Sequence, residues 1–162
     1  MRFTRFVMLA VGIAFFSAGA SAQNMAGQKV VTLEMAETMA QTAMATCRTN
    51  GFKVTVLVVD ALNMTKAMLR DDGAAPSTTQ VATLKANSTM LYNRPSGPAQ
   101  PPPPGTVAPP STLPGTINAQ GALPIKVGDL TIGAIAVSGA PGGDKDLVCA
   151  SAGLAKIADK LK

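Results

Sequence analysis

Nine of the twelve prolines of this chain lie between Pro95 and Pro114, and four of them follow one another at 101–104. Proline has no backbone N–H and a fixed φ, so a segment this rich in proline cannot form a helix or a sheet ladder. We therefore expect residues 93–121 to form an exposed, polyproline-II-like loop inserted between folded elements. The loop either docks into an aromatic-lined groove of a partner or is a surface loop without a specific role.

The first 22 residues have the layout of a cleavable secretory signal peptide. Arg2 and Arg5 give a positive start, residues 6–16 (FVMLAVGIAFF) form an apolar stretch, and residues 20–22 (ASA) form a small-x-small cleavage site. Such a short apolar stretch cannot span ~30 Å of hydrocarbon as a helix, although an uncleaved anchor is the alternative. We expect cleavage before Gln23 and a mature protein in the periplasm or outside the cell.

Residues 23–162 are enough for a single domain with a real core. The formal charge falls from +5 to +3 once the two arginines of the signal are removed. The chain has no run of Lys or Arg, no Trp and one Tyr, so it lacks the stacking surfaces and basic patches of a nucleic-acid-binding protein. No later segment is apolar for long enough to cross a membrane.

The absence of histidine limits the chemistry. It excludes a Ser-His-Asp or Cys-His nucleophilic system, a His-based zinc site and a His-ligated haem. The two cysteines cannot form a four-cysteine metal site within one chain. We expect no metal site, and an enzyme would have to rely on other side chains or on a bound cofactor.

Apolar residues at helical spacing predict three helices, over 33–49, over 77–92 and at the C-terminus. Thr32 is the expected N-cap of the first, and Ser77 with Gln80 matches a capping box for the second. The expected buried stripes are Leu33, Ala36, Ala40, Ala43 and Cys47 in the first helix, Val81, Leu84, Ser88 and Leu91 in the second, and Leu147, Ala150, Leu154, Ile157 and Leu161 in the last.

Four runs predict strands, at 54–59, 64–70, 124–127 and 130–138. Short turns within each pair make two hairpins. Gly133 inside the last strand suggests a close approach by another backbone or a ligand. Because hairpins dominate, we expect an α+β fold with an antiparallel sheet covered by helices.

Two groups of residues could bind a ligand. The turn 138–144 (SGAPGGD) precedes a helix and could present backbone N–H groups to an anion around Gly139, Gly142 and Gly143, or it could simply need positive φ angles. The second group could line one pocket mouth, where Arg and Lys would hold ligand carboxylates such as haem propionates, or it could be a solvated rim of unrelated charges. Its members are Arg70, Asp71, Asp72, Lys85, Tyr92 and Arg94.

Several motifs resemble the GlcG/HbpS family of haem-binding-type proteins. They are residues 54–60 (VTVLVVD) followed by 69–74 (LRDDGA), Lys85-Ala86, residues 121–125 (GALPI), and residues 132–143 (IGAIAVSGAPGG) followed by 146–154 (DLVCASAGL). The similarity covers roughly residues 30–161 apart from the proline-rich stretch. The chain departs from the family where Ala61-Leu62-Asn63 replaces the usual Gly-Gly turn and where Gly121-Ala122 replaces Gly-Gly.

The resemblance implies a profilin-like domain of α/β/α layers with a five-stranded antiparallel sheet. The fifth strand would lie within 110–123, and residues 29–31 would either join the first helix or add an edge pairing. It also implies haem or a related tetrapyrrole as ligand and a homo-oligomer. Without histidine, an iron ligand would have to be Tyr92, a Met, a hydroxyl or a Lys, or the porphyrin would be held mainly by burial.

Two alternatives to a small-ligand-binding protein stay open. One is an enzyme, or an enzyme accessory, acting on a small acid with Asp72, Lys85 or Tyr92 as acid–base groups; the other is an oligomeric interaction module that uses the proline-rich loop.

In a profilin-like fold the first and last helices would share one sheet face. If these two helices are antiparallel, Cys47 and Cys149 can form a disulfide, and the oxidising compartment of an exported protein favours it. The alternative is that the two cysteines are buried, unpaired thiols.

Overall fold

The computed structural model describes residues 29–98 and 113–162. The expected signal peptide and the centre of the proline-rich loop lie outside these residues. The elements are α1 (Leu33–Thr49), β1 (Thr55–Asp60), β2 (Thr65–Arg70), α2 (Ser77–Tyr92), β3 (Ala122–Val127), β4 (Leu130–Ser138), α3 (Gly143–Ala155) and a 3₁₀ turn, η2 (Ala158–Leu161).

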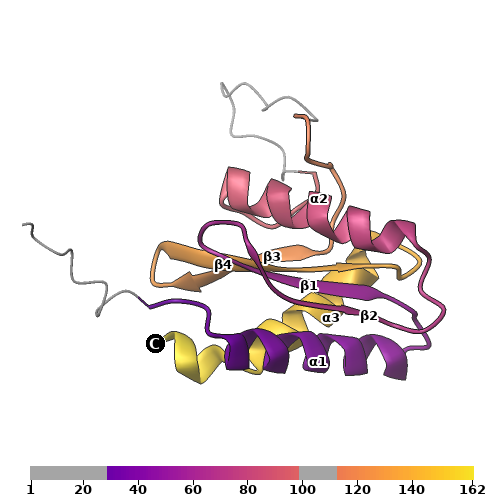
Figure 1. The fold of residues 1–162 in the computed structure, drawn as a ribbon, viewed down its shortest axis with the longest axis horizontal. Coiled ribbons are helices and arrows are strands. Elements are labelled where there is room, and N and C mark those ends of the chain that lie inside the picture. Colours follow the sequence, from indigo (N-terminus) through magenta and orange to yellow (C-terminus); the bar gives the residue numbers. More distant parts are fainter. Residues whose placement is uncertain (1–28, 99–112) are drawn as a thin grey trace, which may run out of the picture.

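The strands form one antiparallel sheet in the order β2-β1-β4-β3 (Figure 1). Both predicted hairpins are present. Within the described residues the sheet has four strands, so the expectation of five is wrong: residues 29–32 and 113–121 are not in strands. Gly133 lies where a Cβ atom would collide with the Val59 carbonyl oxygen, so the predicted close approach comes from the neighbouring strand β1.

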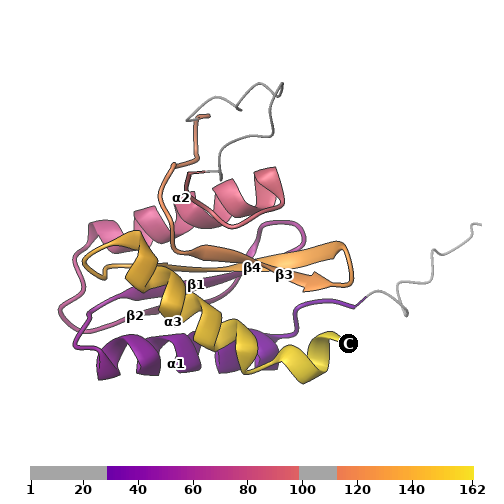
Figure 2. The same cartoon turned by 180° about the vertical axis from the view of Figure 1, so that it is seen from behind.

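Helices cover both faces of the sheet (Figures 1 and 2). One face packs against α1 and α3 and holds the larger side chains of the core, among them Met39, Val56 and Ile135. The other face packs against α2 and is made largely of alanines, with Leu57 and Val59 between them. The α+β class and the antiparallel sheet predicted from the sequence are therefore confirmed.

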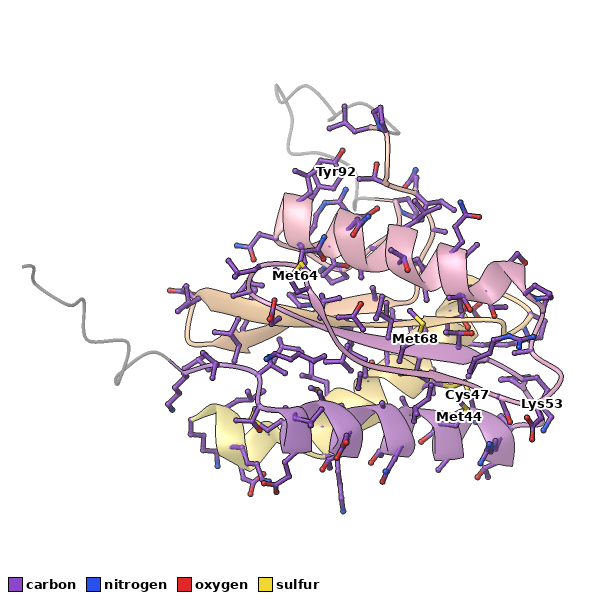
Figure 3. All side chains as sticks on the ribbon, viewed as in Figure 1. Met44, Cys47, Lys53, Met64, Met68 and Tyr92 are labelled. Atoms are coloured by element: carbon purple, nitrogen blue, oxygen red, sulfur yellow. A yellow bond between two sulfur atoms is a disulfide. The ribbon has the colours of Figure 1, made fainter. Side chains whose placement is uncertain are left out.

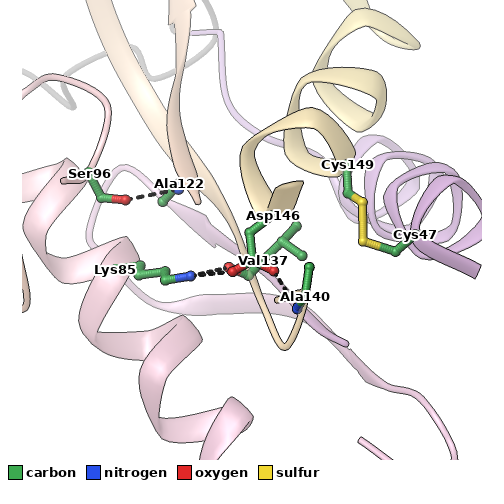
Figure 4. Close-up of polar contacts among 8 residues, drawn as sticks. All are labelled: Cys47, Lys85, Ser96, Ala122, Val137, Ala140, Asp146 and Cys149. Atoms are coloured by element: carbon green, nitrogen blue, oxygen red, sulfur yellow. Dashed lines mark hydrogen bonds and ion pairs between the residues drawn. A yellow bond between two sulfur atoms is a disulfide. The ribbon is translucent and has the colours of Figure 1, made fainter. Parts of the chain in front are cut away.

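A disulfide joins the two helices that share a face. Cys47 near the end of α1 and Cys149 in α3 have Cα atoms 5.6 Å apart and are fully buried (Figure 4). The predicted pairing is confirmed. It crosslinks residues that are 102 positions apart in the sequence.

The start of α2 differs from its prediction. Ser77 does not cap the helix: the N-cap is Pro76, whose backbone already has helical φ and ψ, and no side chain caps the helix. Proline favours the first turn because its fixed φ suits a helix and its missing N–H would have had no partner there. The N-cap predicted for α1 is confirmed, because the Thr32 hydroxyl accepts a hydrogen bond from the Met35 N–H.

The buried face of α2 is also rotated from the predicted stripe. Val81 and Leu84 are only half-buried, and Leu91 is 55% exposed. The opposing sheet is lined with alanines, so the helix approaches through small and polar side chains. The buried residues of α2 are Thr78, Ala82, Lys85, Ala86, Ser88 and Thr89. In α1, Leu33 is likewise exposed rather than buried.

Candidate functional site

The residues predicted to share one pocket mouth lie in three separate places. Arg70 ends β2, beside Thr55, whose hydroxyl contacts that of Thr78 in the first turn of α2. Tyr92 is the last residue of the same helix, whose 16 residues span about 24 Å. Figure 3 shows Tyr92 far from Lys53, which lies 3.6 Å from the carboxylate of Asp71, the residue after Arg70. The prediction of one common mouth is therefore wrong.

Lys85 is not at any mouth, because its side chain is only 4% exposed. Its Nζ donates to Asp146 Oδ2 at 2.7 Å and to the carbonyl oxygen of Val137 at 2.9 Å (Figure 4). A Cβ atom on Gly121 would come within 2.7 Å of that Nζ, so only glycine leaves room for the ammonium group. The family motifs include both Lys85 and Asp146, but nothing in the sequence indicated that these two residues, 61 positions apart, form a pair.

The predicted glycine-rich turn is held from within by the same carboxylate. Asp146 Oδ1 accepts a hydrogen bond from the Ala140 N–H at 2.9 Å, while Oδ2 accepts from Lys85. Burial raises the pKa of Asp146, although the hydrogen bond and charge of Lys85 act the other way. Gly139 packs against the backbone of Lys53. Asp146 thus links the turn to α2 through Lys85.

Gly142 and Gly143 lie at the start of α3. Gly142 is its N-cap, and its N–H donates to the Ala140 carbonyl oxygen at 2.8 Å. Gly143 packs against Gln120, where a Cβ atom would come within 2.6 Å of the carbonyl oxygen. These contacts account for the glycines by internal packing, and anion binding at the turn stays a prediction.

Basic residues gather at the end of β2. Arg48 of α1 makes a two-point contact with the buried carboxylate of Asp71, at 2.8 and 3.1 Å, and Lys53 lies 3.6 Å from it. The hydrogen bonds from Arg48 hold the pKa of Asp71 below its ordinary value against the effect of burial. Arg70 donates to the carbonyl oxygen of Ala74. The predicted Asp72 is exposed next to this group.

A first hollow, of about 310 Å³, lies between α1 and β2; we call it the edge groove. On its α1 side, polar Gln41 and Arg48 lie at the two ends of the groove, and the apolar residues Met44 and Ala45 lie between them at helical spacing. The lining residues are Gln41, Met44, Ala45 and Arg48 of α1 and Met68, Leu69 and Arg70 of β2.

A second hollow, of about 430 Å³, lies at the opposite end, between the turn after β1 and the last turns of α2; we call it the turn hollow. Leu62 is 81% exposed there and Leu91 55%. Asn87 of α2 connects its walls, accepting from Asn63 at 2.8 Å and donating to the Gly115 carbonyl oxygen at 2.9 Å. The lining carries no charge and consists of Ala61, Leu62, Asn63, Asn87, Met90, Leu91, Pro114, Gly115 and Thr116.

The predicted Tyr92 and Arg94 follow directly on the part of α2 that lines the turn hollow. The Arg94 guanidinium lies 5.4 Å from the centroid of the Tyr92 ring and donates to the carbonyl oxygens of Pro95 and Gly97. The sequence missed the hollow itself, because its walls come from three segments far apart in the chain. The one signal that could have indicated it was the substitution of Ala61-Leu62-Asn63 for a Gly-Gly turn.

Residues 31–155 match the family model described as "Haem degrading protein HbpS-like". The chain belongs to the HbpS-like family. The match spans both hairpins and all three helices, and it confirms the resemblance seen in the sequence motifs. The described residues of this HbpS-like chain contain no helix long and apolar enough to cross a membrane.

Solved structures similar to this HbpS-like protein include HbpS itself, with 33% identity, a TM-score of 0.68, and coverage of 79% of this chain and 90% of that one. A double mutant of HbpS from Streptomyces reticuli is 31% identical, with a TM-score of 0.70 and coverage of 91% and 97%. Protein ORFY of Klebsiella pneumoniae is 25% identical, with a TM-score of 0.71 and coverage of 85% and 98%. No curated protein matches the chain significantly.

Proposed function

We propose that this protein is exported and binds haem or a related tetrapyrrole. The observation that carries the proposal is membership of a family described as haem degrading, over residues 31–155. Binding is favoured over catalysis because the acid–base candidates Asp72, Lys85 and Tyr92 do not converge. Asp72 is exposed at one end of the sheet, Lys85 is buried in an ion pair, and Tyr92 lies at the far end of α2.

The turn hollow fits a porphyrin better than the edge groove does. It is the larger of the two, its lining is uncharged, and it carries the exposed side chains of Leu62 and Leu91, whose burial by a flat apolar ligand is favourable. In the edge groove, Arg48 is already bonded to Asp71.

Two lining residues of the turn hollow carry groups that can ligate iron, the thioether of Met90 and the hydroxyl of Thr116. Thr116 Oγ1 donates to the Leu113 carbonyl oxygen and accepts from the Leu113 N–H, so this hydroxyl is occupied. Met90 is therefore the residue of this hollow that would hold the iron, and burial would supply the rest of the affinity. Bound haem would bring the iron chemistry that the chain lacks.

Haemin titration of the purified mature protein tests the proposal. We expect saturable binding at micromolar haemin with a shift of the Soret band. Leu91→Asp should weaken binding by about tenfold or more, since it places a charge on an apolar wall. Val148→Asp is the matched control, because Val148 is equally exposed, at 58%, but lies on α3. Absence of saturable binding would refute the function, and equal binding by both variants would refute the location.

Met90→Leu separates ligation from burial. It keeps the size and apolarity of the side chain but removes the sulfur, so we expect a changed Soret maximum with little loss of affinity. An unchanged spectrum would remove Met90 as a ligand while leaving the turn hollow as the binding site.

Export is supported by the Cys47–Cys149 disulfide, because such bonds persist outside the reducing cytosol. Sequencing the N-terminus of secreted or periplasmic protein tests it, with Gln23 expected as the first residue. The homo-oligomer implied by the family resemblance remains part of the proposal, and sedimentation of the mature protein checks it.

A further inference from the structure

The outer edge of β2 offers unpaired backbone groups. The Asp71 N–H donates to the Val54 carbonyl oxygen at 2.9 Å, which fixes the phase of the β1–β2 ladder. In an antiparallel ladder, residues that bond the partner strand alternate with residues that do not. The backbone groups of Leu69 therefore face β1, while those of Met68 and Arg70 face outward. Among the described residues no strand pairs with this edge.

The opposite edge, β3, is much less suited to receiving another strand. It contains Pro124, which has no N–H to donate. Register shifts occur in both edge ladders, between Ile125 and Lys126 and between Val58 and Val59, so the proline is the difference. Proline is a usual means by which proteins block strand addition. β2 has no proline, so in the part of the chain that the structure describes the β2 edge is the one open to strand addition.

Helix α1 extends beneath the open edge. Gln41 and Arg48 bound the edge groove and are seven residues apart, which corresponds to about 10 Å of helix. About three residues of an extended strand have the same length. A strand laid along β2 would therefore cover this part of α1, and its alternate side chains would point into the groove.

The groove favours a particular side-chain pattern. Its middle is apolar, at Met44 and Ala45, and its end is basic. Three cations gather at that end, Arg48, Lys53 and Arg70, and the nearby carboxylates are Asp71 and Asp72, which leaves one positive charge in excess. Each guanidinium also has more N–H donors than the bonds described above use. An acidic side chain is the complementary partner for this end.

We propose that the edge groove binds an extended peptide segment of another protein by strand addition to β2. The segment carries an acidic residue that contacts Arg48, with the charge of Arg70 close by on the other face of β2. Two positions along, it carries an apolar residue over Met44 and Ala45. Residues two apart in a strand point to the same side, about 6.6 Å from each other, which matches the spacing between the basic end and the apolar middle. This site is separate from the turn hollow and does not depend on haem binding.

A second copy of the chain is a poorer occupant. Pairing two β2 edges would bring Lys66 and Arg70 of both copies together, and like charges close to one another across a strand pair are destabilising.

Fluorescence anisotropy of a labelled, capped peptide, Thr-Thr-Glu-Thr-Leu-Thr-Thr, with haem-free mature protein tests the proposal. We expect saturable binding below about 1 mM, weakened about tenfold or more by Arg70→Glu. Lys156→Glu is the matched control, since it makes the same charge change at an exposed site at the end of α3 and should leave binding unchanged. Far-ultraviolet circular dichroism checks that both variants fold.

Backbone methylation tests strand addition itself. Methyl groups on one alternate set of peptide nitrogens should abolish binding, while the same number on the other set should not, because only one set faces β2. No binding by the parent peptide, equal loss from both methylated sets, or insensitivity to Arg70→Glu would each overturn the proposal. A mature protein that sediments as a dimer and becomes a monomer with Arg70→Glu would assign the edge to a second copy and overturn it as well.

Discussion

The two faces of the sheet are held to their helices in different ways. On the face covered by α1 and α3, larger apolar side chains fill the space and a disulfide joins the helices. On the face covered by α2, the contact consists of alanines and of polar links, chiefly the Lys85–Asp146 ion pair. Large apolar side chains and a disulfide hold α1 and α3 on one face of the sheet. Close packing of α2 on alanines and a buried ion pair hold the helix on the other face. The two faces should therefore respond to different perturbations.

The largest expected effect comes from removing the crosslink on the α1–α3 face. The double change Cys47→Ala and Cys149→Ala opens a loop whose ends are 102 residues apart. The chain-entropy model gives a loss of about 4–5 kcal/mol in the free energy of unfolding. Urea denaturation of the oxidised protein and of the double variant measures it. A reductant should destabilise the wild type and leave the variant unchanged; equal midpoints would contradict the role given to the disulfide.

Next in size is the loss of the charge pair on the α2 face. Lys85→Met keeps much of the side-chain volume but leaves the Asp146 carboxylate buried without its partner. Breaking a buried pair from one side costs about 3–5 kcal/mol. The matched control is the double variant Lys85→Met, Asp146→Asn, which removes both charges and keeps an acceptor for the Ala140 N–H. We expect the double variant to be more stable than Lys85→Met; the reverse order in urea denaturation would show that the pair is not what secures this face.

The difference between the faces also explains what the sequence could predict. The bounds of α1 and β4 followed from the Thr32 cap, the helical spacing and the β-branched run, because these signals are local. The disulfide could be inferred because the resemblance placed both helices on one face. The face of α2 that packs on the sheet could not be predicted. Its strongest apolar period is that of Val81, Leu84 and Leu91, and these side chains are not buried. The alanines that decide the packing lie on strands far along the chain.

The site was predictable only in parts. The sequence identifies residue types that can bind a ligand, such as Arg70, Lys85 and Tyr92. Where these side chains lie depends on the tertiary structure, which the sequence pattern does not give. Seven residues on one helix separate Lys85 from Tyr92, yet one side chain is buried in an ion pair and the other lies at the helix end. The partner of Asp71 in the fold, Arg48, is 23 residues away and has no motif to mark it.

A third prediction tests the close approach of α2 to the sheet. Ala86 is fully buried against the alanine-lined face, so Ala86→Leu should overpack it and cost about 1–3 kcal/mol. Leu91→Ala on the same helix should change the unfolding free energy little, because Leu91 is largely exposed. Thermal or urea denaturation compares the two variants. If Leu91→Ala were the more damaging, the helix would be packing through the face that its apolar period suggests.

The smallest expected effect concerns the carboxylates of Asp71 and Asp146. These two groups should change the free energy of unfolding with pH in opposite directions. The pKa of Asp71 is lowered in the folded state, so its contribution to stability is present above the unfolded value of about 3.9 and is lost as the pH falls through the folded value. The pKa of Asp146 is raised, so its contribution is present below about 3.9 and is lost as the pH rises through its folded value. The unfolding free energy of the wild type, Asp71→Asn and Asp146→Asn should be measured from about pH 7 to about pH 3. On acidification, Asp71→Asn should lose less stability than the wild type, and Asp146→Asn should lose more. Parallel curves for all three proteins would mean that neither carboxylate changes its proton affinity on folding, and the electrostatic difference between the two faces would then disappear.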